Sequence, residues 1–277
     1  MSRLATQDAL SANALERKLA RQTVLRRVVP VLMLALALLV WELVVRFNQI
    51  PHYIIPAPSL VAETLVKDWH SLMPALWFTV KVTFISLVLA VVGGVLIAVL
   101  FALSPWVELS LFPYAIILQV TPVVAVAPLI LIYAPSTTVA LLICAWLVAF
   151  FPILSNTVIG LKSADHNLRD MFTLYEATPW QRLRFLLLPS ALPYFLAGLK
   201  IAGGLSLIGA VVAEFVAGAA GRETGLASRI LESSFRTEIP RMFAALVLVS
   251  LLGIVIYLLF NALSRYLLKD WHESELK

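Results

Sequence analysis

Two charged residues, Glu42 and Lys81, lie within long apolar runs and are therefore candidates for a chemical role. Charged groups at membrane depth are rare, and they pair with one another or mark a proton or ion pathway. On helices that rise 1.5 Å per residue, each would lie roughly 8–9 Å from the outer end of its run. We therefore predict an intramembrane ion pair between Glu42 and Lys81, with a proton relay as the alternative.

A second candidate set combines polar side chains with prolines in the stretch QVTPVVAVAP, which contains Gln119, Thr121 and Pro122. Proline in a helix frees a backbone carbonyl and kinks the axis. In lipid, the freed group must be satisfied by protein or by cavity water. The pattern is typical either of simple helix kinks or of a polar passage, and we take these three residues as candidates for the passage.

Glu214 is a further acidic residue in an apolar run. It follows Tyr194 by about 20 residues, or roughly 30 Å along a helix, which places it near the outer mouth. We expect Glu214 either to anchor the loop Gly218–Gly225 or to face a solute in the passage.

Several kinds of chemistry are not indicated. The sequence has no HExxH or GxSxG motif and no G-x-x-x-x-G-K-[ST] phosphate-binding loop. Cys144 is the only cysteine, so the chain can form neither an intramolecular disulfide nor a cysteine-based zinc site. We expect no catalytic residue and no metal site.

The composition is that of a membrane protein. Of 277 residues, 61% are hydrophobic and 13% are charged, whereas soluble domains carry roughly 25% charged residues. The net charge of +5 is better explained by basic cytoplasmic segments than by nucleic-acid binding, because Lys and Arg favour the inner side of a membrane. We expect contact with lipid and none with nucleic acid.

Hydropathy predicts an all-α fold with six spans and both termini inside the cell. The domains are a cytoplasmic segment 1–27, a transmembrane region 28–268 and a cytoplasmic tail 269–277. The apolar runs are each near or above the length of about 20 residues needed to cross a bilayer. The six are Val28–Phe47, Ala75–Leu103, Leu109–Tyr133, Thr137–Leu161, Tyr194–Gly218 and Met242–Leu268.

Two outer segments are also substantial. LVAETLVKDWH, before the second span, has the apolar spacing of a short interfacial helix. The segment 219–240 is polar, and we expect it to cover the mouth of the bundle.

The segment 163–193 is charged and amphipathic, and it interrupts the apolar runs on the inner side. Leu168, Met171, Phe172 and Tyr175 follow the i, i+3, i+4, i+7 spacing of one helix face, and Asp165 is a suitable N-cap.

A second helix is predicted from Thr178, because Thr178-Pro179-Trp180-Gln181 is a capping box with proline at the first helical position. Leu188-Pro189 is expected to close the segment before the next span. Such a hairpin is either a docking surface or an amphipathic element that lies on lipid.

The segment resembles the cytoplasmic loop of binding-protein-dependent ABC importer permeases, whose signature is E-A-A, three residues, G, nine residues, I-x-L-P. Anchored on Leu188-Pro189, the signature isoleucine falls on Leu186 and the glycine on Glu176. The E-A-A triplet then falls on Asp170, Met171 and Phe172. The visible Glu176-Ala177-Thr178 is six residues out of register, and glutamate at the glycine position would cost about 1 kcal/mol in a left-handed turn.

Other stretches extend the resemblance over most of the chain. PAPS, TPVVAVAPLILIY and FFPILSNTVIGL resemble the nitrate, sulfonate and taurine branch. LPSALPYFLAGLKIA and LIGAVVAEFVAG look closer to permeases for pyrimidine thiamine precursors or riboflavin.

The resemblance implies the type I ABC importer permease fold, with the hairpin as the ATPase-coupling element. Its coupling residues would be Asp170, Met171, Phe172, Glu176, Ala177, Thr178, Leu186, Leu188 and Pro189. It further implies a homodimer in the bacterial inner membrane, a dimer of ATPase subunits, and a periplasmic or lipid-anchored solute-binding protein. This chain would bind no cofactor, because ATP and Mg²⁺ would be held by the partner ATPase.

Two other function classes are weighed against this one. An ion-coupled secondary transporter needs midplane charges and often repeat symmetry, and neither is evident. For an intramembrane enzyme, the chain contains no HExxH or GxSxG catalytic motif. For the solute, a pyrimidine precursor or riboflavin-like heteroaromatic is preferred. A sulfonate, taurine or nitrate-type anion comes second, because the apolar runs contain no arginine cluster.

Overall fold

The fold is known from a computed structural model that describes residues 28–221 and 225–269. The predicted segment 1–27 and all but the first residue of the predicted tail 269–277 lie outside the described residues. The chain divides into two compact units, residues 1–63 and 64–277, and each is described by itself.

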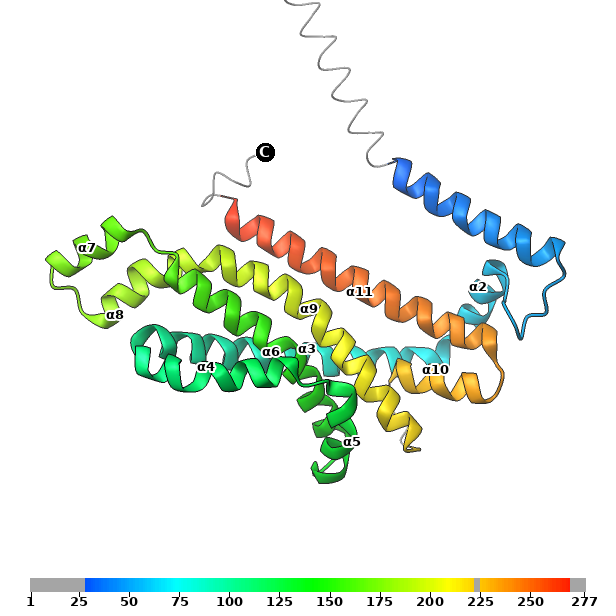
Figure 1. Ribbon diagram of the computed structural model, residues 1–277. Helices are drawn as coiled ribbons and strands as arrows, with labels where there is room; N and C mark the ends of the chain where they lie inside the picture. The colour runs from blue at the N-terminus through cyan, green and yellow to red at the C-terminus, as the bar shows by residue number, and fades with distance from the viewer. Residues whose placement is uncertain (1–27, 222–224, 270–277) are drawn as a thin grey trace, which may run out of the picture. The chain divides into compact units, whose positions relative to one another are not determined.

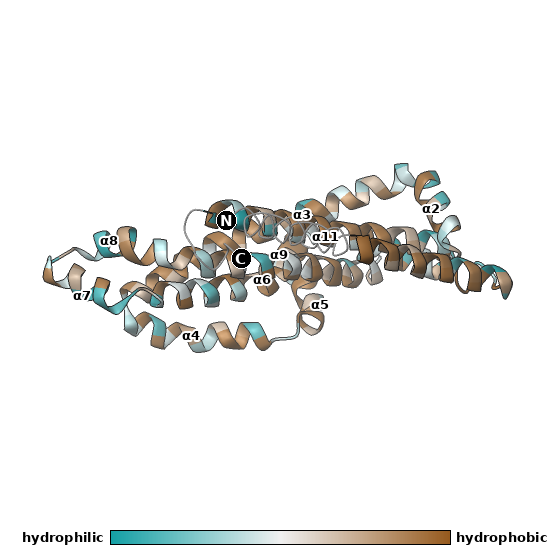
Figure 2. Cartoon of the chain, turned by 90° about the horizontal axis from the view of Figure 1, so that it is seen from above, coloured by the Kyte–Doolittle hydropathy of each residue, from teal (hydrophilic) through white to brown (hydrophobic). Residues whose placement is uncertain are grey.

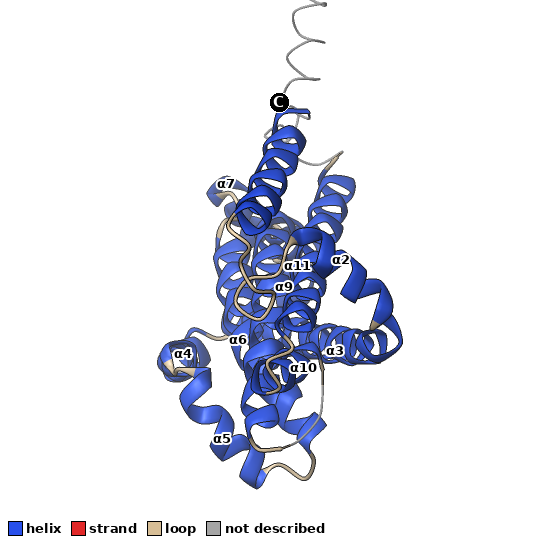
Figure 3. Cartoon of the chain, turned by 90° about the vertical axis from the view of Figure 1, so that its right-hand side faces the viewer, coloured by secondary structure: helices blue, strands red, loops and turns tan. Residues whose placement is uncertain are grey.

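Every regular element in the described ranges is a helix, as Figure 3 shows. The sequence of elements begins with the helix Val28–Phe47. It continues through α2 (Pro58–Lys67), α3 (Trp69–Leu103), α4 (Pro105–Val120), α5 (Val123–Tyr133), α6 (Thr137–Lys162), α7 (His166–Leu174), α8 (Pro179–Arg182), a π-helical turn (Leu183–Leu187), α9 (Leu188–Ala219), α10 (Leu226–Phe235) and α11 (Ile239–Leu268).

Five of the six predicted spans correspond to helices long and apolar enough to cross a membrane. The third predicted span, Leu109–Tyr133, corresponds to two helices, α4 and α5, which together are apolar enough to cross a membrane as one broken span and are bent by 99° at the break between them. Thr121 and Pro122 occupy the break in extended conformations, since proline lacks the N–H needed to continue the ladder and disfavours helical geometry in the residue before it.

In the first unit, the helix Val28–Phe47 ends in a left-handed turn at Gln49, where φ is 50°. The first turn of α2 then lies beside it. The backbone N–H of Ser59, near the start of α2, donates to Glu42 Oε2 over 3.0 Å. The short helix predicted in LVAETLVKDWH is therefore confirmed as α2, but it begins at Pro58 and ends at Lys67.

In the second unit, α6 is the central helix and packs most extensively on α9 and then on α3. Glycines on α9 permit this close approach. A Cβ at Gly209 would lie 2.9 Å from Cα of Ala145, and one at Gly198 would lie 2.8 Å from Cβ of Asn156. Larger side chains at these two positions would separate α9 from α6.

Polar elements occupy the two ends of this bundle. Figure 1 shows α7 and α8 at one end of the long helices and α10 at the opposite end. In Figure 2 hydrophobic residues predominate on the long helices, while hydrophilic residues are prominent on α7 and α8. The sequence did not predict α10, which forms within the polar segment expected to cover the mouth of the bundle.

Candidate functional site

The hairpin begins with α7, which is capped and tied to the bundle at its start. Asp165 accepts hydrogen bonds from the backbone N–H groups of Asn167 (2.7 Å) and Leu168 (3.3 Å), so the predicted N-cap is confirmed. Arg169 Nη2 donates to the carbonyls of Leu161 (3.1 Å) and Lys162 (2.8 Å). These carbonyls belong to the last turn of α6, so Arg169 fastens α7 to the end of that helix.

The turn after α7 has the left-handed geometry that the signature register predicts. Glu176 has φ of 50°. Its N–H donates to Thr173 O (3.0 Å), and the next N–H, of Ala177, donates to Phe172 O (2.9 Å). These two bonds form a Schellman motif, which usually has glycine at the left-handed position. Glu176 therefore adopts the left-handed conformation that was expected for the glycine position.

The second half of the hairpin starts at the predicted capping box. Gln181 N donates to Thr178 Oγ1 (3.3 Å), and Thr178 N donates to Gln181 Oε1 (2.8 Å). Arg182 Nη2 also reaches back to Thr173 Oγ1 over 3.1 Å. The two helices are thus braced against each other by a side-chain hydrogen bond.

The prediction that Leu188-Pro189 closes the hairpin is wrong. The helix runs on from Pro179 through the π-helical turn Leu183–Leu187 and into α9 without interruption. Pro189 has no N–H and would crowd the carbonyl four residues before it in a regular α-helix. The wider π-helical turn directly before it accommodates this conflict, so the second half of the hairpin and α9 form one uninterrupted helix.

Most predicted coupling residues are exposed, and several apolar ones gather around a groove of about 350 Å³. The groove is lined by Met171, Phe172, Tyr175, Ala177, Gln181 and Phe185. Leu186 is instead buried in the core. Sequence reasoning missed Leu174, which is 85% exposed, and Phe185. Leu174 lies on the short amphipathic helix α7 and Phe185 lies in the π-helical turn, and the available signal for both was an apolar side chain within a charged segment.

A second cavity lies at the break between α4 and α5. Its volume is about 380 Å³, and Gln119 and Thr121 are in its wall. Pro122 sits at the break itself as the N-cap residue of α5. Glu214 does not line this cavity. The structure therefore brings two of the four candidate passage residues to one cavity and places a third beside it.

Glu214 is fully buried and fixes the start of α10. Its Oε1 accepts from Thr79 Oγ1 (2.8 Å), and its Oε2 accepts from Ala227 N (3.0 Å). Thr79 Oγ1 in turn accepts from Leu226 N (3.0 Å). Of the two roles considered for Glu214, these contacts support the anchoring one, although the anchored element is α10 rather than a loop.

Glu42 and Lys81 each have neighbours within their own unit. The carboxylate of Glu42 accepts from Arg46 Nε and from Ser59 Oγ. Lys81 Nζ lies 5.5 Å from the centre of the Trp77 ring, a cation–π distance. The ion pair between Glu42 and Lys81 stays a prediction.

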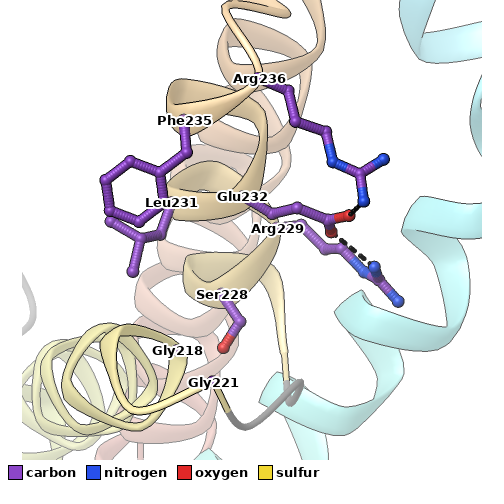
Figure 4. A pocket seen from close by; sticks show the side chains of 8 residues that line it. All are labelled: Gly218, Gly221, Ser228, Arg229, Leu231, Glu232, Phe235 and Arg236. Atoms are coloured by element: carbon purple, nitrogen blue, oxygen red, sulfur yellow. Dashed lines mark hydrogen bonds and ion pairs between the residues drawn. The ribbon is translucent and has the colours of Figure 1, made fainter.

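At the opposite end from the hairpin, α10 carries an ionic cluster beside a pocket (Figure 4). Glu232 Oε2 pairs with Arg229 Nη1 at 2.7 Å, and its Oε1 pairs with Arg236 Nη2 at 3.0 Å. The hydrogen bond from Arg229 is the main cause that lowers the pKa of the Glu232 carboxyl. Among the described residues, no three His, Cys, Asp or Glu side chains are grouped to hold a metal ion.

The fold and the hairpin define a class of protein, and comparison with known families agrees. Residues 90–269 match the family described as "Binding-protein-dependent transport system inner membrane component". The chain belongs to this family. It is a multi-pass inner-membrane permease subunit of an ABC importer, a non-catalytic component whose family implies ATPase and solute-binding partners.

Individual relatives fall in the predicted branch. The chain is 34% identical over 249 residues to the riboflavin transport system permease protein RibX of Chloroflexus aurantiacus, covering 87% of this chain and 89% of that one. It is 32% identical over 247 residues to the formylaminopyrimidine transport permease protein ThiX of Halalkalibacterium halodurans, covering 89% and 96%.

Among solved structures, an inward-facing MetNI methionine ABC transporter matches with a TM-score of 0.59 and 20% identity. The match covers 69% of this chain and 94% of that one. At this identity the likeness concerns the fold alone, and it identifies that fold as the type I importer permease fold.

Proposed function

We propose that this chain translocates an uncharged heteroaromatic solute, driven by ATP hydrolysis on a partner ATPase that docks on the α7–α8 hairpin. The observation that carries the coupling role is the exposed apolar surface of the hairpin, at one end of the bundle and continuous with α9. Leu174 and Tyr175 are 85% and 80% exposed. Surfaces of this kind mark protein or membrane contacts, and membership of the importer family favours a protein partner.

The choice of solute rests on the relatives. The riboflavin and formylaminopyrimidine permeases are 34% and 32% identical to this chain, whereas an aliphatic sulfonate permease is 26% identical. A sulfonate, taurine or nitrate-type anion is the second candidate solute.

The proposed assembly is a homodimer with two ATPase subunits inside the cell and a solute-binding protein outside. Both termini would lie inside, and ATP and Mg²⁺ would be bound by the ATPase alone. Gln119, Thr121 and Pro122 are proposed to line the passage between the two sides. Glu214 is proposed to hold α10 at the outer mouth, where the binding protein arrives.

Reconstitution in proteoliposomes tests this function. The permease, its ATPase and its binding protein should accumulate riboflavin or formylaminopyrimidine only when ATP and the binding protein are both present. Uptake of taurine but of neither heteroaromatic would overturn the proposed solute, and uptake that needs an ion gradient but no ATP would overturn the proposed mechanism.

The hairpin is tested by Leu174→Asp, with Leu174→Met as the matched control. Burying one leucine contributes about 1.5–3 kcal/mol, so the aspartate variant should lose more than tenfold in affinity for the ATPase. The methionine variant keeps an apolar side chain of similar size and should bind as the wild type does. Equal ATPase binding by both variants would rule this surface out.

A further inference from the structure

We propose that the cavity at the α4–α5 break is a solute-binding site inside the membrane, suited to a flat, uncharged heteroaromatic molecule. This inference rests on the proposed function and adds that the permease itself, as well as the binding protein, recognises the solute. The site draws on four helices, α4, α5, α6 and α9.

The cavity has the size and the walls of a small-molecule site. Its volume of about 380 Å³ lies within the range of roughly 300–1,000 Å³ that is usual for ligand pockets. Its apolar wall includes Phe151 from α6 and Leu205, Ile208 and Val212 from α9. An aromatic ring next to aliphatic side chains favours a flat apolar surface on the ligand.

The cavity also offers neutral hydrogen-bonding groups of both kinds. The Gln119 side chain, which has no hydrogen-bond partner among the described residues, supplies an amide donor and acceptor at the wall. Pro152 lacks an N–H, so the carbonyl of Val148 is freed from the helical ladder of α6, and both residues line the cavity. Ring nitrogens, N–H groups and carbonyls of a heteroaromatic solute would find partners here.

Charge argues against an anionic ligand. None of the thirteen described residues that line the cavity carries a charged side chain. The break brings together the carbonyl end of α4 and the amide end of α5, whose partial charges have opposite sign and offset each other. A sulfonate would give up its hydration without gaining a counter-charge.

Equilibrium dialysis on the detergent-purified permease–ATPase complex, without binding protein, provides the test. Riboflavin, formylaminopyrimidine and taurine are the probes. We expect the wild-type complex to retain a heteroaromatic and not taurine. Val148→Trp should abolish retention by filling the cavity, and Ile159→Trp should not alter it, since Ile159 is 52% exposed on the same helix and lies outside the cavity wall.

Gln119→Leu provides a second measurement if Val148→Trp fails to assemble, because the Gln119 side chain is exposed in the described chain. Loss of its hydrogen bonds should raise the dissociation constant about tenfold.

The outcomes separate the two proposals. Heteroaromatic uptake in proteoliposomes without retention by the wild-type complex would overturn this inference and leave the proposed function standing. Retention unaffected by Val148→Trp, in a complex that assembles, would also overturn it. Uptake of taurine alone would instead overturn the proposed solute.

Discussion

Three described helices end in left-handed turns formed by residues other than glycine, at Gln49, Glu176 and Thr237. In each turn a backbone N–H donates a hydrogen bond to the carbonyl five residues earlier; in the third turn Glu238 N donates to Ser233 O over 2.9 Å. A side chain in this region costs about 1 kcal/mol relative to glycine. The chain therefore carries local strain at these helix ends, including the turn of the coupling hairpin.

The first prediction concerns Glu176→Gly, which should raise the free energy of unfolding by about 1 kcal/mol because glycine adopts the left-handed geometry without strain. Thermal unfolding of the purified permease measures it. Glu176→Ala is the control: it removes the carboxylate but keeps a Cβ, so it should give no comparable gain. A gain for alanine equal to that for glycine would assign the effect to charge rather than to the backbone.

The second prediction concerns the proposed pair of Glu42 and Lys81. Glu42→Lys and Lys81→Glu should each reduce the yield of assembled permease, because a charge at membrane depth then faces a like charge. The double variant should recover assembly, measured by size-exclusion chromatography in detergent. Absence of recovery would mean that the contacts of Glu42 with Arg46 and Ser59 account for this carboxylate without Lys81.

The third prediction is a pH dependence at Glu232. Arg229 lowers the pKa of this carboxyl from its usual 4.5, so the folded chain holds the proton less tightly than the unfolded chain. The resulting stabilisation is present above pH 4.5 and is lost as pH falls through the lowered pKa of the folded state. Glu232→Gln should therefore lower Tm at pH 7, and its difference from wild type should vanish in acid. Glu63→Gln, at an exposed position, is the control, and a difference independent of pH would contradict the prediction.

Among the elements, α7 is hydrogen-bonded to the end of α6 through the side chain of Arg169. Arg169 donates to two carbonyls there, and hydrogen bonds to a charged group contribute about 1.5–3 kcal/mol. The fourth prediction is that Arg169→Met lowers the amount of solute transported per ATP hydrolysed in proteoliposomes. Without the two hydrogen bonds of Arg169, movement of the hairpin would no longer be transmitted to α6.

Arg184→Met is the matched control for Arg169→Met. Arg184 lies on the same hairpin, where its guanidinium is 5.5 Å from the centre of the Phe185 ring, and in the described part of the chain it makes no hydrogen bond to the backbone of α6. Its loss should leave the coupling ratio unchanged. An equal fall for both variants would indicate a general effect of basic charge on the hairpin.

The limits of sequence reasoning are clearest at the prolines. Hydropathy located the spans, since apolar runs of sufficient length have few alternatives to a membrane helix. A proline in the sequence indicates that the helix is distorted there, but it does not indicate how large the bend will be. Pro122 accompanies a 99° bend, whereas Pro189 is absorbed by a π-helical turn without a break. The difference depends on what packs around each helix, and local sequence does not contain that information.

The candidate site divides in the same way. Caps at Asp165 and Thr178 were predictable because their hydrogen bonds are local. An anchoring role was one of the two expected for Glu214, but its partner Thr79 was not predictable, because the two residues lie 135 positions apart in the sequence.

For the whole molecule, the opposite positions of the hairpin and α10 yield a fifth prediction. Cys144 is buried, so Cys144→Ser provides a background without thiols. On it, Tyr175→Cys should react with a membrane-impermeant maleimide only from the inner side of oriented vesicles, and Phe235→Cys only from the outer side. Both positions are strongly exposed, at 80% and 77%. The reverse pattern would mean that the termini lie outside.

The π-helical turn Leu183–Leu187 also determines which changes in length this segment tolerates. A π turn uses one more residue than an α turn. Deleting one codon here would convert the π turn into a regular α turn and would leave the hairpin at nearly the same angle around the axis of α9. Deleting one codon from a regular stretch of α9 would instead rotate everything before it by about 100° and redirect the hairpin away from its partner.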